Sequence, residues 1–138
     1  MGLESIASTE KKKNFSVELV SFGYKYGSEY GDLVFDARFI PNPYYVDTLK
    51  PLNGRDKACA DYVFGYSLTR AIFQSLKVLA ISMARGYVEK GWEYLKICIG
   101  CTGGQHRSVA LIEGLARVMA DAGFTVKIRH REMDAGRY

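Results

Sequence analysis

Residues 95–116 read LKICIGCTGGQHRSVALIEGLA, and this stretch decides the fold. Its first part, Leu95–Gly100, is a short apolar run that predicts a buried strand. Its last part opens a helix that is expected over residues 108–122, with Gly123 just past its end. Four residues of this helix recur at helical spacing and are expected to face the core: Val109, Ile112, Ala116 and Met119. A strand joined to a helix by a short loop is typical of α/β proteins.

Three more strands and two more helices are expected around this unit. Val17–Phe22, Leu33–Phe39 and Thr125–Arg131 are short β-rich runs with glycine or proline near their ends. Helices are predicted from an Asp56 cap to Phe64, and from a Ser67 cap to about Lys90. Because neighbouring parallel strands need crossover connections, we predict an α/β fold with a mostly parallel sheet of about four strands flanked by helices.

The longest predicted helix carries an apolar stripe. Its members are spaced by three or four residues, so they share one face, which we expect to pack on the core: Ile72, Leu76, Leu79, Met83 and Tyr87.

The composition is that of one ordinary globular domain. We divide the 138 residues into a lead-in that we expect to be mobile, 1–14, and a single domain, 15–138. Hydrophobic residues make up 48% and charged residues 25%, which argues against wholesale disorder. The net charge of +4 permits an anionic ligand or nucleic acid without demanding either. No apolar run approaches the roughly 18 residues of a membrane span. The three cysteines cannot all pair, which favours a reducing compartment. We therefore expect a cytoplasmic protein, and the lack of a long apolar run predicts no membrane association.

The loop between the predicted strand and helix carries the most specific signal. Gly103 and Gly104 allow backbone N–H groups to turn inward, and the start of the following helix offers unpaired donors. Arg107 adds a planar fork that suits phosphate oxygens, and Thr102, His106 and Ser108 add polar groups. The pattern favours a phosphate site over a purely structural turn.

A catalytic alternative uses the same loop. Cys101 and Arg107-Ser108 have the C-x5-R-S spacing of cysteine phosphatases, in which a thiolate attacks a phosphate held by the loop. Gly100 stands where those enzymes usually place a His, and no Asp is marked as the general acid. A cysteine-dependent phosphatase is therefore the second hypothesis, and we favour a protein that is not an enzyme.

Two other motifs do not lead to a cofactor. Cys98 and Cys101 form C-x-x-C, but no second pair exists, and Cys98 lies within an apolar strand as a buried thiol. Residues 86–91 imitate the start of a nucleotide P-loop, yet Trp92 follows where a Lys is required. We therefore expect no cofactor and no metal.

Ligands of open α/β sheets collect beyond the carboxyl ends of the strands. Four segments reach that edge in the predicted topology. The polar groups expected there are Lys25, Asp36, Arg38, the loop from Cys101 onward, and His130.

The last predicted strand has three alternating cations. Lys127, Arg129 and Arg131 share one face, because side chains alternate along a strand. They suit an RNA backbone or a ligand phosphate, or they form a solvated edge. The tyrosines, including Tyr44 and Tyr45, could stack on bases or sugars.

Five ordered motifs resemble the carboxyl-terminal domain of the RapZ RNase-adaptor family. They are SFGYKYG at 21–27, FDARFIPNP at 35–43, LNGRD at 52–56, GCTGGQHRSV at 100–109 and RHR at 129–131. The resemblance runs from about Val17 to Asp134. It implies a fold similar to a phosphofructokinase subdomain, RNA binding as an RNase adaptor, and sensing of a phosphorylated amino sugar. Full-length members also carry an amino-terminal nucleotide-binding domain with a Walker motif, which does not occur in this sequence.

The resemblance and the motifs together give one set of expected ligand residues: Lys25, Asp36, Arg38, Cys101, Thr102, Gly103, Gly104, His106, Arg107 and Ser108. The expected RNA-binding residues are Lys127, Arg129 and Arg131. Our hypothesis is a non-catalytic regulatory module that binds a small phosphorylated metabolite. The resemblance to the family implies that this metabolite is an amino-sugar phosphate. RNA, a protein partner and a homo-oligomer are all compatible with the sequence.

Overall fold

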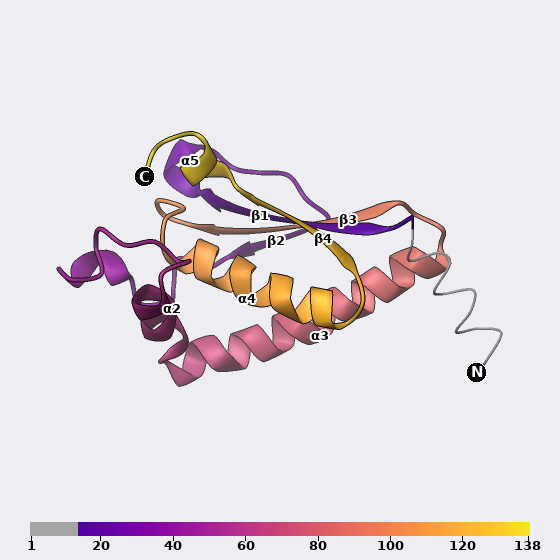
Figure 1. The fold of residues 1–138 in the computed structure, drawn as a ribbon, viewed down its shortest axis with the longest axis horizontal. Coiled ribbons are helices and arrows are strands. Elements are labelled where there is room, and N and C mark those ends of the chain that lie inside the picture. The colour runs from indigo at the N-terminus through magenta and orange to yellow at the C-terminus, as the bar shows by residue number, and fades with distance from the viewer. Residues whose placement is uncertain (1–13) are drawn as a thin grey trace.

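The computed structural model describes residues 14–138 (Figure 1). Most of the predicted lead-in therefore lies outside the described residues. The elements follow one another as β1 Ser16–Gly23, the 3-10 turn η1 Tyr24–Tyr26, β2 Leu33–Asp36, the 3-10 turn η2 Pro43–Tyr45, α2 Lys57–Phe64, α3 Ser67–Glu89, β3 Tyr94–Cys101, α4 Arg107–Asp121, β4 Thr125–His130 and α5 Arg131–Asp134.

The four strands form one parallel sheet in the order β2-β3-β1-β4. This confirms the predicted α/β fold. In the register, Val20 of β1 lies between Cys98 of β3 and Arg129 of β4. All four strands point the same way, so their carboxyl ends share one edge of the sheet.

The helices α2, α3 and α4 all lie on one side of the sheet in Figure 1, while η1 and α5 lie at its carboxyl edge. The main core fills the space between the helices and the sheet, and its fully buried members include Val17, Leu19, Ile97, Leu111 and Leu115. Among residues 14–138, the opposite face holds a small buried cluster of Val20, Phe22 and Cys98, with Tyr24 packed against it. The sequence did not predict this one-sided arrangement.

Several helices and strands end or begin one to three residues away from the positions that the sequence predicts. Strand β2 ends at Asp36 instead of Phe39, because the chain turns there and Arg38 N–H bonds the Asp36 carboxylate at 2.9 Å. Strand β4 ends at His130, and Arg131 already belongs to α5. Asp56 stands at the cap position of α2, yet its side chain accepts from Asn53 N–H at 2.8 Å instead of capping the helix.

The buried stripe of α3 differs from the one that the sequence suggested. Leu79 is 44% exposed, whereas the stripe runs through Leu76, Ala80, Ala84 and Val88. Ile72, Met83 and Tyr87 flank it and are partly buried. The reason is that alanines allow the helix to approach the core closely, so small residues occupy the centre of the contact and larger ones its margins.

Gly54 is fixed by a close contact with the start of α4. A Cβ on this residue would lie 2.3 Å from Ala110 N and 2.4 Å from His106 O, and Gly54 N–H donates to Gln105 O at 2.9 Å. The neighbouring atoms belong to backbone and cannot rotate away.

Gly54→Ala should therefore lower the free energy of unfolding by roughly 1–3 kcal/mol, the usual cost of overpacking. Gly86→Ala is the matched control, because a Cβ there meets nothing within 4 Å. It should raise stability by about 0.5–1 kcal/mol, as helical Gly→Ala changes do. Urea unfolding of both variants measures the difference, and equal effects would contradict this account of Gly54.

Candidate anion-binding site

A pocket of about 230 Å³ opens at the carboxyl edge of the sheet. Four segments form it: η1, the chain around η2, the loop between β3 and α4, and the last residue. The side chains and backbone that line it are those of Lys25, Asn42, Tyr44, Tyr45, Cys101, Thr102, Gly103, Gln105, His106, Arg107 and Tyr138. The site therefore lies at the edge where the parallel topology predicts it.

The loop after β3 is folded onto the end of β1. Gly104 has φ +71°, a conformation that favours glycine, and a Cβ there would lie 2.7 Å from Gly23 N. A Cβ on Gly23 would in turn lie 2.5 Å from Gly103 C. Lys25 N–H donates to Thr102 O at 3.1 Å and continues the contact. These approaches bring Lys25 and the loop into one pocket.

The loop presents a run of free backbone donors. Among residues 14–138, the N–H groups of residues 103–107 have no hydrogen-bond acceptor, and His106 gives no side-chain cap to α4. The first N–H groups of a helix are unpaired by geometry, and they carry the positive end of the helix dipole. Free donors at the start of a 15-residue helix are suited to an anion.

Arg107 is the charged group of this loop, and it is only 3% exposed. Its Nη1 donates to the carbonyl oxygens of Arg38 at 2.7 Å and Ile40 at 3.0 Å. Its Nη2 reaches Thr102 Oγ1 only at 3.4 Å, and its buried Nε has no partner in the described chain. One end of the guanidinium is therefore anchored, while the Nε–Nη2 edge keeps donors for a planar or tetrahedral anion.

His106 and Gln105 attach the loop to residues 50–52. His106 Nε2 lies 3.1 Å from Lys50 O, and Gln105 Nε2 donates to Leu52 O at 2.7 Å. Burial lowers the pKa of His106 below its ordinary value of 6.5, so the ring is neutral at pH 7. The carbonyl partner requires the proton on Nε2, which leaves Nδ1 as an acceptor.

The two thiols of the C-x-x-C pattern have different surroundings. Cys101 Sγ lies in the pocket wall, 3.1 Å from Ser108 Oγ and 3.5 Å from Ser108 N. Cys98 is three residues away on the strand, belongs to the cluster on the opposite face, and donates to Tyr30 O at 3.3 Å. Burial raises the pKa of the Cys98 thiol to about 11. No group of three or more metal-binding side chains occurs among residues 14–138.

The structure sorts the expected ligand residues into three groups. Those that line the pocket are Lys25, Cys101, Thr102, Gly103, His106 and Arg107. Gly104 and Ser108 are buried behind them, and Ser108 contacts Cys101. Asp36 and Arg38 do not line the pocket.

Asp36 and Arg38 bind each other beside the pocket. The carboxylate accepts Arg38 Nη2 at 2.6 Å, and the guanidinium stacks over the Tyr24 ring at 4.0 Å. Hydrogen bonds from Arg38 lower the pKa of Asp36 despite its partial burial. The contribution of Arg38 to the site is its carbonyl oxygen, which orients Arg107.

His130 does not reach the pocket either. Its ring is buried between Ser21 Oγ at 2.6 Å and Glu113 Oε2 at 2.8 Å, so it ties β4 to β1 and α4.

Five lining residues were absent from the expected set of ligand residues: Asn42, Tyr44, Tyr45, Gln105 and Tyr138. The sequence had suggested Tyr44 and Tyr45 only for stacking on bases or sugars. Asn42 had a local signal, because its side chain accepts Tyr44 N–H at 3.1 Å and so caps η2. Gln105 lies inside the recognised loop. Tyr138 has no sequence signal, since it reaches Gly103 only through the tertiary fold.

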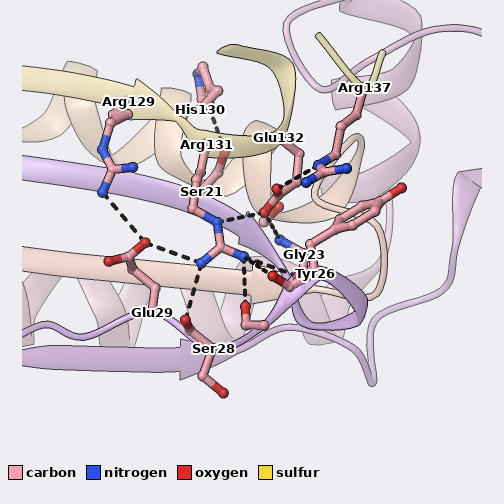
Figure 2. Close-up of polar contacts among 12 residues, drawn as sticks. Ser21, Gly23, Tyr26, Ser28, Glu29, Arg129, His130, Arg131, Glu132 and Arg137 are labelled. Atoms are coloured by element: carbon pink, nitrogen blue, oxygen red, sulfur yellow. Dashed lines mark hydrogen bonds and ion pairs between the residues drawn. The ribbon is translucent and has the colours of Figure 1, made fainter. Parts of the chain in front are cut away.

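The three cations of β4 and α5 have different environments. Lys127 is exposed, and Arg129 is 40% exposed and lies 3.5 Å from Glu29. The Arg131 side chain is 19% exposed and is surrounded by carbonyl and carboxylate oxygens (Figure 2). Lys127 and Arg129 pair in register with Glu18 and Val20 of β1, on the sheet face away from α3 and α4.

Within residues 14–138, no helix is both long and apolar enough to cross a bilayer.

Comparison with known proteins gives a family match and close relatives. The model of the RapZ C-terminal domain family matches residues 15–134. A "Nucleotide-binding protein" of Carboxydothermus hydrogenoformans is 43% identical over 129 residues, 93% of this chain and 45% of that protein. Proteins of the same designation from Oceanobacillus iheyensis and Symbiobacterium thermophilum are 46% identical over 126 residues and 45% identical over 121 residues. These cover 91% and 87% of this chain, but only 43% and 40% of the relatives. The chain thus spans less than half the length of the curated relatives it matches.

Proposed function

Because the chain belongs to the RapZ C-terminal domain family, we propose that it is a non-catalytic regulatory module that binds a small phosphorylated metabolite. The relatives are named for nucleotide binding, yet they are more than twice as long as the matched region. The loop at 101–108 lacks the Gly-Lys-Ser/Thr ending of a nucleotide P-loop. We therefore assign a phosphate group to this pocket, and not a nucleoside triphosphate.

The observation that carries the proposal is the unused edge of Arg107. Its buried Nε has no partner in the described chain, and it belongs to the same loop as the free N–H groups of residues 103–107. A buried donor without an acceptor costs about 1–3 kcal/mol. A phosphate oxygen supplies that acceptor together with a negative charge, which none of the hydrogen-bond partners of Arg107 in the described chain carries.

The rest of the pocket suits a sugar ring. Tyr44, Tyr45 and Tyr138 offer aromatic surface and hydroxyl groups, and Asn42 and Gln105 offer amides. No Asp or Glu is among the lining residues in the described chain. The amino group of an amino-sugar phosphate would therefore bind neutral oxygen atoms. Otherwise, Asp36 would have to release its hydrogen bond with Arg38 and accept one from the amino group. Affinities for a hexose phosphate and the matching hexosamine phosphate decide whether the amino group is recognised.

Arg107→Lys keeps the charge and removes the two-donor edge. It should weaken binding of a hexosamine phosphate by about 1.5–3 kcal/mol, the range for a hydrogen bond to a charged group. Titration calorimetry measures the change. Arg107 also holds two carbonyl oxygens, so thermal unfolding must show that the variant is folded at the titration temperature.

Arg117→Lys is the control for that variant. Arg117 lies on the same helix, is exposed and does not line the pocket. Its affinity should equal that of the wild type. Equal affinities for all three proteins would contradict the proposal.

A cysteine-dependent phosphatase is the second candidate, and one contact favours it. Ser108 Oγ and N–H both lie near Cys101 Sγ, where they would stabilise a thiolate. Against it, Cys101 is only 2% exposed, and the described lining residues include no carboxyl group to act as the general acid for a leaving group.

Cys101→Ser separates the two candidates. For a binding module, affinity should stay within about tenfold, because the sulfur atom only lines the wall. An aryl phosphate should not be turned over by either protein. Turnover by the wild type that disappears in the variant, or a phosphocysteine detected by mass spectrometry, would establish the phosphatase instead.

An RNA-binding role as an RNase adaptor is supported by the placement of Lys127 and Arg129. Both lie on β4 and pair in register with Glu18 and Val20 of β1, and Val20 belongs to the buried cluster on the sheet face away from α3 and α4. Cations on such a face attract a phosphate backbone, and each neutralised phosphate releases counterions.

The double variant Lys127→Ala/Arg129→Ala should bind unrelated RNAs more weakly and with a flatter salt dependence. The slope should fall by about 0.7 for each phosphate of a single strand that is no longer neutralised. Filter binding from low to moderate salt measures it, with Arg117→Ala as a control that removes a cation on the helix side of the molecule. An unchanged slope, or no binding by the wild type at low salt, would show that this face is only solvated.

A further inference from the structure

Arg131 is bound almost entirely by the turn that carries Lys25. Its Nη2 donates to Gly27 O at 2.6 Å and lies 3.4 Å from both Gly23 O and Tyr26 O. Its Nη1 donates to Ser28 O at 3.1 Å. Figure 2 shows the guanidinium from α5 pointing into the centre of these oxygen atoms. One side chain therefore holds both ends of η1.

Glu132 completes this attachment from the next position. Its carboxylate is 2% exposed and accepts Gly23 N–H at 2.8 Å and Arg131 Nε at 2.9 Å. Arg137 Nε lies 3.3 Å from its other oxygen (Figure 2). Gly23 is thus held through its N–H by Glu132 and through its carbonyl by Arg131.

The turn at 23–29 has few other backbone hydrogen bonds, although its side chains Tyr24, Tyr26 and Glu29 contact Phe22, Arg137 and Lys96. Within the described chain, its backbone bonds beyond β1 are Gly27 N–H to Tyr24 O and Lys25 N–H to Thr102 O, both at 3.1 Å. Lys25 lines the anion pocket from this turn. The position of its ammonium group relative to the loop at 102–107 therefore depends on what holds the turn.

We propose that Arg131 is a positioning residue for the anion pocket, which acts by fixing the turn that carries Lys25. This inference rests on the proposed function, and it gives the RHR segment at 129–131 a role other than RNA contact for its last residue. The planar guanidinium group of Arg131 is required, because its N–H donors diverge toward carbonyl oxygens on both sides of the turn. A lysine would keep the charge but could not hold the same set of oxygens.

Arg129 provides a matched control. It lies two residues earlier on the same sheet face and shares the Glu29 carboxylate with Arg131, at 3.5 Å and 3.2 Å. It makes no contact with the carbonyl oxygens of residues 23–28 among the described interactions. Arg129→Lys therefore makes the same chemical change beside the same carboxylate without releasing the turn.

The test is a set of phosphate titrations by calorimetry, at a temperature where every variant is folded. Inorganic phosphate is the probe. Arg131→Lys should bind about tenfold more weakly than the wild type, close to the loss in Lys25→Met, whereas Arg129→Lys should bind within about twofold. The double variant Lys25→Met/Arg131→Lys should bind no more weakly than Lys25→Met alone, because Arg131 acts through Lys25.

Two results would overturn the inference while leaving the proposed function intact. One is wild-type affinity in Arg131→Lys, and the other is an additive loss in the double variant. If Arg131→Lys does not fold, Glu132→Gln replaces it in the titration. This variant keeps an oxygen for Gly23 N–H and removes the negative charge beside Arg131 Nε. Wild-type affinity for phosphate in Glu132→Gln would likewise overturn the inference. Failure of the wild type to bind phosphate would overturn the proposed function and this inference together.

Discussion

The backbone of Gly104 lies against that of Gly23 with no room for a side chain on either residue. This contact joins the end of β3 to the end of β1, two segments that are far apart in the sequence. Because the two backbones touch, Lys25 from one segment and Arg107 from the other line the same small pocket. The glycines thus set the distance between the two walls of the site.

The second constraint is electrostatic. Arg107 is buried, and the hydrogen bonds that it makes in the described chain go to carbonyl and hydroxyl oxygens, so no bonded carboxylate compensates its charge. Asp36 is close enough to be affected by that charge, yet its hydrogen bonds come from Arg38. The start of α4 adds positive potential at the same place. A buried cation without a paired anion is unfavourable, so an anion that binds in the pocket would also stabilise the folded protein by mass action.

The sequence predicts the strands, the helices and the segments that meet at the site, because these follow from apolar periodicity, glycine signals and the parallel topology. It does not predict which side chains of those segments point inward. Arg38 and Asn42 follow the same strand, and only the turn after Asp36 decides that Asn42 lines the pocket. In α3, the periodicity of large residues selects Leu79, whereas close packing buries Ala80. Tyr138 enters the site through long-range folding alone.

The cations at 127, 129 and 131 have identical spacing, and their different environments follow from how far each stands from the carboxyl edge of the sheet. Lys127 lies within the strand and faces water, Arg129 comes within reach of Glu29, and Arg131 passes the end of β4 and meets the open carbonyl groups of the turn. Strand alternation gives Lys127 and Arg129 the same direction, whereas Arg131 follows the strand and reaches backbone that has no strand partner. Glu29 bonds both arginines, so the exposed cation of β4 and the residue that holds the turn with Lys25 share one carboxylate.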